Sequence, residues 1–163
     1  MLFRSPRVLE LLSMLTWWAF PVDEWAALGF LRAPWVDVPP ATLDSWKKNS
    51  GSFEPFWESD HPVARCLAPH RSSAIRPGEL LALLIEDAGL EAELSELSQS
   101  LLSLWHRCEK LSLQGCDFVE AVRRLQDSIR GGGREKEVPP PANRGVLPIL
   151  TVHASKEIGR AHV

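Results

Sequence analysis

The chain has 163 residues, of which 45% are hydrophobic and 24% are charged. This balance is typical of a chain that folds around a core, and it excludes the low hydrophobicity and high net charge of intrinsic disorder. The formal net charge of -3 excludes a general electrostatic attraction to nucleic acid, so any contact with DNA must be local.

The cysteines and the apolar runs indicate the kind of compartment. Cys66, Cys108 and Cys116 form no CxxC pair, which argues against a zinc site, an iron-sulfur cluster or a disulfide framework. We expect reduced thiols in a cytoplasmic protein. The apolar runs fall short of the ~20 residues that a membrane helix needs, and the first residues lack the pattern of a signal peptide. The sequence therefore predicts neither a metal nor a membrane partner.

The first predicted element is a helix that follows Pro6. Apolar residues recur there at steps of three and four, which places them on one stripe of a helix. Ser5 and Pro6 suit the cap and the first turn, and Pro21 ends the pattern. The residues of this stripe are Val8, Leu11, Leu12, Leu15 and Trp18.

A second, short helix is predicted to begin at Asp23 and to end before Pro34, since proline disfavours a helical residue in front of it. With the first helix it forms a helical hairpin that occupies residues 1 to 34. The residues of the second helix expected to point inward are Trp25, Leu28 and Leu31.

Prolines repeatedly interrupt the pattern between residues 35 and 76, where we expect loops and two short helices, near Pro40 to Lys48 and near Pro62 to Leu67. Large aromatic residues are expected to anchor this irregular region by burial in the core. The alternative is a platform on which the bases of a single strand stack. These aromatic residues are Trp35, Trp46, Phe53, Phe56 and Trp57.

Three longer helices are predicted between residues 77 and 130. The first begins at Pro77, and the third begins at Asp117. The middle helix carries a narrow apolar seam and therefore needs a partner, which the third helix is expected to supply. A coiled-coil dimer is the alternative. The seam consists of Leu94, Leu97, Leu101, Leu104, Cys108 and Leu111.

The character of the chain changes after residue 130. Residues 131 to 145 combine three glycines, a charged stretch and three prolines, which is typical of a linker. The apolar run from Val146 to Val152 predicts a strand that is buried on both faces of a parallel sheet. The fold class expected from these patterns is mainly α, followed by one β-strand of an incomplete α/β domain.

The end of this predicted strand carries the sequence LTVHASK, from Leu150 to Lys156. It resembles the T-[IVL]-H-x-[AS]-K-G-L-E motif of the UvrD/RecB/AddA-type superfamily 1 DNA helicases. The resemblance implies that Thr151, His153 and Ser155 contact the DNA backbone, and that Lys156 and Glu157 belong to a loop coupled to the nucleotide. Hydroxyl and imidazole groups are suitable donors to a phosphate, which fixes the position of a strand without reading its sequence.

Two helical stretches, residues 6 to 45 and 94 to 130, resemble the same family in the expected order. In this interpretation the chain spans part of the second RecA-like domain and its helical insertion. The implied divisions are the hairpin at 1 to 34, the insertion at 35 to 130, the linker at 131 to 145, and the strand with its motif at 146 to 157.

The sequence departs from the family after Lys156, where the motif requires Gly-Leu-Glu. Here Glu157 is followed by Ile-Gly-Arg-Ala-His-Val, which is also one translation of a widely used sequencing-library adapter. We expect that the native residue at position 157 is glycine and that residues 158 to 163 are a non-native tail.

The resemblance implies a fragment of an ATP-dependent DNA helicase that acts in repair and recombination, with ATP and Mg²⁺ as cofactors of the parent protein. The chain has no G-x-x-x-x-G-K-[ST] motif, so it should not hydrolyse ATP alone. The implied partners are single-stranded DNA, the remainder of the helicase and a second helicase-nuclease subunit. The alternatives are a noncatalytic helical interaction module and an independent enzyme that uses Ser155 and His153.

Overall fold

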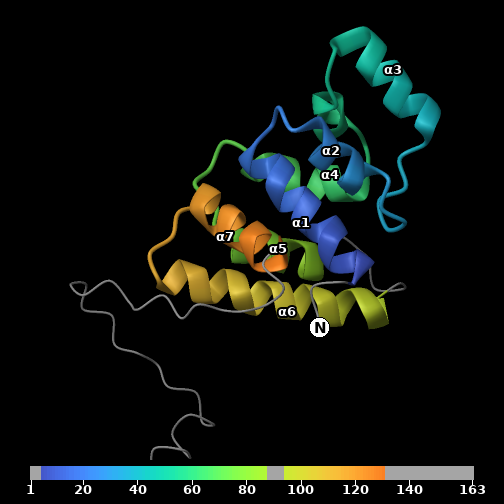
Figure 1. The fold of residues 1–163 in the computed structure, drawn as a ribbon. Coiled ribbons are helices and arrows are strands. Elements are labelled where there is room, and N and C mark those ends of the chain that lie inside the picture. The colour runs from blue at the N-terminus through green and yellow to red at the C-terminus, as the bar shows by residue number, and fades with distance from the viewer. Residues whose placement is uncertain (1–4, 88–93, 131–163) are drawn as a thin grey trace, which may run out of the picture.

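The computed structural model describes residues 5–87 and 94–130 (Figure 1). These residues form seven α-helices, two short 3₁₀ helices and no strand. The prediction of a mainly α fold is therefore confirmed, whereas the predicted linker and strand lie outside the described residues. The α-helices are α1 (Pro6–Ala19), α2 (Glu24–Leu31), α3 (Pro40–Ser50), α4 (Pro62–Leu67), α5 (Pro77–Asp87), α6 (Leu94–Leu113) and α7 (Phe118–Arg130).

The predicted hairpin of α1 and α2 is present. Pro6 occupies the first turn of α1, and the backbone N–H of Phe20 donates to the Thr16 carbonyl at 2.8 Å where the helix ends. The Asp23 carboxylate accepts a hydrogen bond from the Ala26 N–H at 3.0 Å, which satisfies one of the free donors at the start of α2. These bonds define the turn between the two helices, which pack against each other.

The prediction that Trp25 points inward is wrong, since its side chain is 86% exposed. The buried face of α2 consists of Ala26, Ala27, Phe30 and Leu31 instead. The two alanines lie on that face, and small side chains let α2 approach α1 closely. Gly29 contributes to the same close approach, because a Cβ atom added there would lie 2.7 Å from the Ser13 hydroxyl oxygen.

Aromatic side chains form the centre of the core, as the sequence predicts. Phe30 is fully buried, and its ring centroid lies 5.5 Å from that of Phe56, 5.6 Å from Trp35 and 6.0 Å from Trp17. Trp17 stacks on Trp57 at a centroid distance of 4.9 Å. These contacts join α1 and α2 to the 3₁₀ helix Glu54–Glu58.

The first segment after the hairpin projects from the rest of the molecule. Figure 1 shows α3 standing apart from the other helices, and Leu43 is its only buried residue. Gly51 ends α3 with a φ of 72°, a left-handed conformation that glycine adopts without steric cost. The predicted short helices near Pro40 and Pro62 are both present as α3 and α4.

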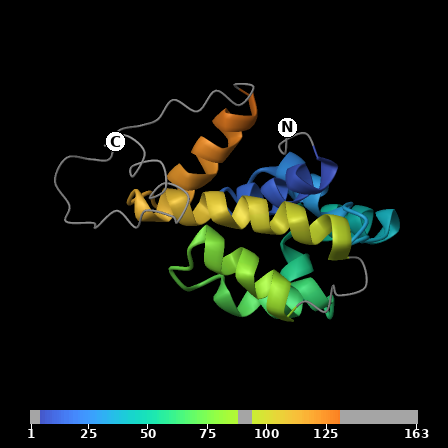
Figure 2. The same cartoon turned by 90° about the horizontal axis from the view of Figure 1, so that it is seen from below.

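The part of the α6 seam whose side chains are described, from Leu104 to Leu111, is covered within the chain. Leu104 and Cys108 are buried, and Leu111 packs against the core. Figure 2 shows α6 passing between α5 on one side and α1 and α7 on the other. The expectation that α7 is the partner is therefore only partly correct, because α5 and α1 supply most of the contacts to α6. The described part of the seam needs no second copy of the chain.

Candidate nucleic-acid interface

The residues predicted to contact DNA from the motif are Thr151, His153 and Ser155. They lie outside the described residues, as do Lys156 and Glu157, which were predicted to couple to the nucleotide. The structure brings none of the five onto a described element. Their roles stay predictions from the sequence.

The aromatic residues that could have formed a stacking platform are used in the core. Trp35, Phe53, Phe56 and Trp57 are buried, and Trp46 packs against Phe56 at a centroid distance of 6.4 Å. A buried ring offers no face to a base. This result confirms the core interpretation for these residues.

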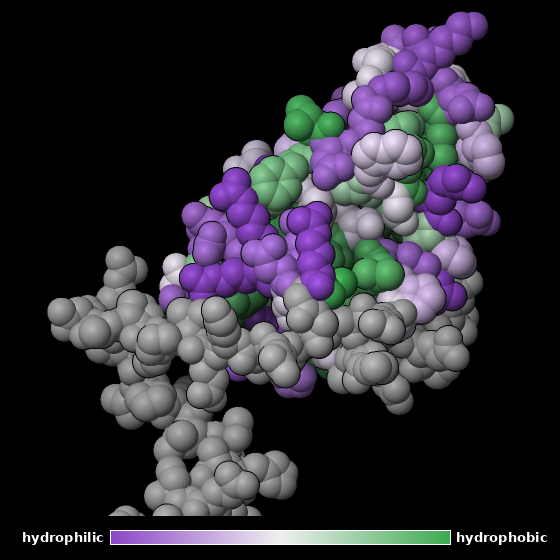
Figure 3. All heavy atoms as spheres, in the orientation of Figure 1, coloured by the Kyte–Doolittle hydropathy of each residue, from purple (hydrophilic) through white to green (hydrophobic). Residues whose placement is uncertain are grey.

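Trp25 is the large aromatic side chain that remains exposed on α2. Arg32, at the C-terminal cap of the helix, follows Trp25 by seven residues and lies on the same side of it. Val22, in the turn before α2, is 90% exposed. Figure 3 shows hydrophobic side chains at the surface over this turn, beside the hydrophilic surface of α7.

Helix α7 lies along α1 and brings further arginines near this face. The Gln126 side-chain amide donates to the Thr16 hydroxyl at 3.0 Å, and the Arg123 guanidinium lies 5.7 Å from the Phe20 ring centroid. Residue numbers fall along α7 as they rise along α1, so the two helices are antiparallel. Arg130 therefore lies toward the start of α1.

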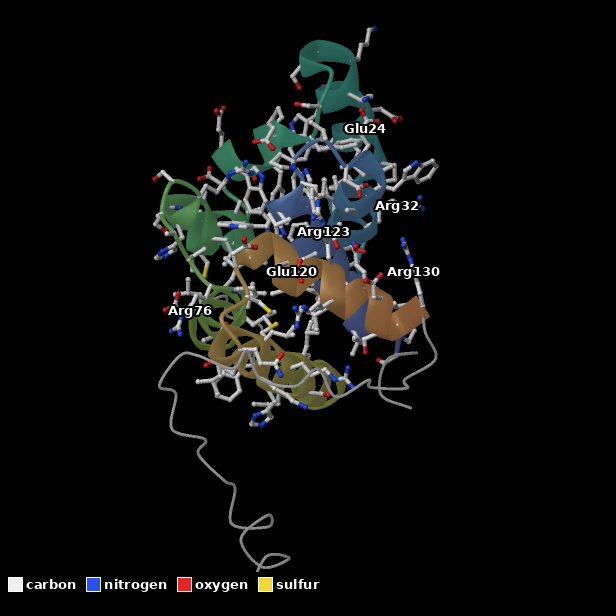
Figure 4. The ribbon with its side chains drawn as sticks, turned by 60° about the vertical axis from the view of Figure 1, so that its left-hand side comes forward. Glu24, Arg32, Arg76, Glu120, Arg123 and Arg130 are labelled. Carbon is white, nitrogen blue, oxygen red and sulfur yellow. The ribbon has the colours of Figure 1, made fainter. Side chains whose placement is uncertain are left out.

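Helix α2 has the same direction relative to α1, since the Trp35 indole N–H, just beyond the end of α2, donates to the Glu10 carboxylate in the first part of α1 at 2.9 Å. Arg32 consequently also lies toward the start of α1. Figure 4 shows Arg32 and Arg130 extending on the same side of the molecule, with Arg123 farther back along α7. We name the surface that comprises Trp25, Arg32, Arg123 and Arg130 the α2–α7 face.

The three arginines of the α2–α7 face differ from most other described arginines in their charge partners. Arg32, Arg123 and Arg130 are exposed and form no ion pair with any described residue. The acidic residues of α7 are Glu120, which pairs with Arg124, and Asp127, which is exposed. The face therefore carries an excess of positive charge on a chain whose net charge is -3.

Other arginines are neutralised by neighbouring carboxylates. Arg124 donates to the Glu120 carboxylate at 2.8 Å, and this hydrogen bond raises the pKa of the guanidinium. Arg76 donates to Glu79, and the hydrogen bonds from Arg76 lower the pKa of that carboxyl. The Arg71 guanidinium pairs with Glu54 and lies 4.9 Å from the Trp57 ring centroid. These groups have no free charge to offer a ligand.

A shallow depression of ≈ 400 Å³ lies between the segment that follows α4 and the start of α5. His70, Ser73 and Glu79 line it with apolar side chains such as Leu83. The Ser73 hydroxyl donates to the His70 carbonyl oxygen at 2.8 Å, and Glu79 is engaged by Arg76. The depression therefore contains no nucleophile held by a base, as acyl-transfer chemistry would require.

Cys108 offers no reactive thiol, and the described ranges contain no metal-binding group. Burial raises the pKa of the Cys108 thiol to about 12, with a smaller contribution from the negative charge of Glu109. A thiol with so high a pKa is protonated at neutral pH and is a poor nucleophile. No set of three potential metal ligands comes together among residues 5–87 and 94–130.

No family model, no curated protein and no solved structure matches the chain. Within the described residues, no helix combines the length and the apolar character that crossing a membrane requires.

The sequence offered one signal for the α2–α7 face. The run from Ala26 to Leu31 contains a complete buried stripe without Trp25, and that stripe leaves Trp25 and Arg32 on the opposite side of the helix. The large hydrophobic surface of tryptophan favoured the inward assignment. No local pattern connects Arg32 with Arg123 and Arg130, because α2 and α7 are far apart in the sequence.

Proposed function

We propose that the chain is part of an ATP-dependent DNA helicase of the UvrD/RecB/AddA type. The parent protein would work in the cytoplasm in DNA repair and recombination, and it would couple ATP hydrolysis to movement along single-stranded DNA. The observation that carries this proposal is the sequence LTVHASK at the end of a strongly apolar run. The helical fold of the described residues is of the class that the proposed insertion requires.

The proposed division of labour follows from the chemistry of the residues. Thr151, His153 and Ser155 would donate hydrogen bonds to phosphate oxygens, which hold a strand in place without reading its bases. Lys156 and residue 157 would belong to a loop that couples this binding of the strand to the bound nucleotide. ATP and Mg²⁺ would be bound by the rest of the parent protein, where catalysis depends on positioning and on stabilising charge at the transferred phosphate.

The proposal is tested by ATP turnover of the full-length parent protein with and without single-stranded DNA. We expect Thr151→Ala and His153→Ala to weaken the stimulation by DNA more than the basal rate, because each change removes a donor to the strand. Thr151→Ser retains the hydroxyl and serves as the matched control. Stimulation that is unchanged in both alanine variants would contradict the assigned roles.

One structural observation favours a second candidate, a noncatalytic helical interaction module. Trp25 and Val22 are 86% and 90% exposed, and exposed large apolar side chains often mark the anchor points of protein interfaces. This function requires self-association or a protein partner rather than DNA. Sedimentation that shows association of the purified chain, abolished by Trp25→Ala, would support it over the helicase proposal.

A further inference from the structure

We infer that the α2–α7 face binds single-stranded nucleic acid, with a base stacked on Trp25 and phosphates paired with Arg32, Arg123 and Arg130. This inference deepens the proposed function, since it names where the helical part of the helicase would hold the strand. It rests on the described helices alone and involves none of the motif residues.

The first support is the exposure of Trp25. Its side chain is 86% exposed, whereas Trp17, Trp35 and Trp57 on the inner side of the same region are buried. Every base has a flat face that can stack on an indole ring, and such stacking does not depend on the base sequence. A tryptophan held outward by a packed helix is therefore suited to a strand of any sequence.

The second support is the position of the charges. Arg32, the C-terminal cap of α2, follows Trp25 by seven residues, and Arg130 follows Arg123 by seven residues on α7, so each pair is separated by about 10 Å along its helix. At roughly 3.4 Å per phosphate in a stacked strand, this length corresponds to about three nucleotides. A base on Trp25 and a phosphate at Arg32 can thus belong to one short stretch of strand.

The third support is the charge balance, which favours nucleic acid over an apolar protein partner. Arg32, Arg123 and Arg130 form no ion pair with any described residue, and of the two acidic side chains of α7, Glu120 is paired with Arg124, which leaves Asp127. An apolar partner would remove these guanidinium groups from water without pairing them, which is unfavourable. A polyanionic strand supplies the missing charges.

The test uses the complete 163-residue chain and a fluorescently labelled oligothymidylate of about 12 nucleotides, which covers a typical single-strand site. Fluorescence anisotropy at low salt gives the Kd. We expect Trp25→Ala to weaken binding by about 5-fold to about 150-fold, the range for loss of one stacked base. Trp25→Phe keeps an aromatic face and should retain most of the affinity, and Val22→Ala should leave it unchanged.

The contribution of the arginines is measured by the dependence of binding on salt. Three phosphate contacts predict a slope of about -2 when the logarithm of the binding constant is plotted against the logarithm of the salt concentration. Each contact to a single strand contributes about -0.7 to this slope. Arg32→Gln, Arg123→Gln and Arg130→Gln should each make the slope shallower by about 0.7. Arg65→Gln removes an exposed arginine on α4, away from this face, and should change neither the slope nor the affinity.

Three results would overturn the inference. Equal affinity of Trp25→Leu and Trp25→Phe would show an apolar contact, as expected for a protein partner. Arginine variants with an unchanged salt slope would show that phosphates do not lie on the face. Binding lost in His153→Ala but retained in Trp25→Ala would assign the strand to the motif, which overturns the inference and leaves the helicase proposal intact.

Discussion

Phe30 and Trp25 lie on the same short helix, and the structure predicts opposite effects when each is replaced by alanine. Phe30 is fully buried and contacts four aromatic rings, those of Trp17, Trp35, Phe56 and Trp57, at centroid distances between 5.5 and 6.3 Å. Removing a buried phenylalanine side chain leaves a cavity and costs about 3 to 5 kcal/mol. The loss of edge-to-face and tilted ring contacts places Phe30→Ala in the upper part of that range.

The expected change is large on the scale of the whole fold. Proteins gain about 0.05 to 0.15 kcal/mol of stability per residue, so roughly 120 described residues correspond to about 6 to 18 kcal/mol. An unfolding entropy of about 2.1 cal/mol/K per residue converts a loss of about 4 kcal/mol into a decrease in Tm of about 16 °C. Phe30→Ala should therefore remain folded at low temperature but melt much earlier.

Urea unfolding followed by circular dichroism and calorimetry measures both quantities. Trp25→Ala is the matched control, because its side chain is 86% exposed and its replacement should change the free energy of unfolding by less than about 0.5 kcal/mol. If the two variants lose similar stability, the register of α2 described above is incorrect. A loss below about 1 kcal/mol for Phe30→Ala would also refute the reasoning.

Three further predictions concern the helices that complete the core. Leu104 is 1% exposed, so Leu104→Ala should lower the free energy of unfolding by about 2 to 5 kcal/mol, as measured with urea. Leu102 is 49% exposed, and Leu102→Ala should lower it by less than about 0.5 kcal/mol. Equal losses in the two variants would mean that the buried face of α6 is assigned incorrectly. The Cys108 thiol should react with a thiol reagent at pH 8 only after the protein unfolds, since burial raises its pKa to about 12. Rapid modification of Cys108 in the native protein would contradict this burial. Glu79 has a lowered pKa in the folded state, so it stabilises the fold above its ordinary value of 4.5 and loses this effect as the pH falls through its folded pKa. Glu79→Gln should therefore slightly reduce the free energy of unfolding at neutral pH and weaken its decrease at acidic pH. Both effects should be small because the Arg76–Glu79 pair is exposed. If the free energy of unfolding changes with pH as it does in the original protein, the Glu79 carboxyl contributes nothing.

Local chemistry made most helix boundaries predictable. Pro6, Asp23, Pro40, Pro62 and Pro77 each mark the start of a helix in the sequence, and each lies at or just before the first turn of α1, α2, α3, α4 or α5. Proline has a backbone angle suited to a first turn and has no N–H that would remain unsatisfied there. Aspartate supplies an acceptor to the free N–H groups.

The orientation of α2 was harder to predict, because its sequence is apolar on nearly every side. Trp25, Leu28 and Leu31 have helical spacing, and so do Ala27 and Phe30 with Leu31. Only packing against α1 decides between the two stripes, and it favours the alanines because they allow close contact. Propensity and periodicity contain no information about this fit.

The α2–α7 face could not be predicted from the sequence for a related reason. Arg32 and Arg130 come together because both helices pack antiparallel to α1, and this depends on contacts such as that of Gln126 with Thr16. The packing of the α6 seam could not be predicted fully either. A leucine pattern predicts that another helix packs on the seam, but it does not identify α5 and α1 as the helices that do so. In contrast, the motif that carries Thr151 and His153 was found from sequence alone and lies outside the described residues.

The most direct test of the helicase proposal is to sequence the genomic locus across the codon for Lys156 and upstream of Met1. The proposal predicts that Gly-Leu-Glu follows Lys156, and that the same reading frame encodes a G-x-x-x-x-G-K-[ST] loop for the phosphates of ATP. A natural frame that continues with Ile-Gly-Arg-Ala-His-Val and encodes no such loop would contradict it.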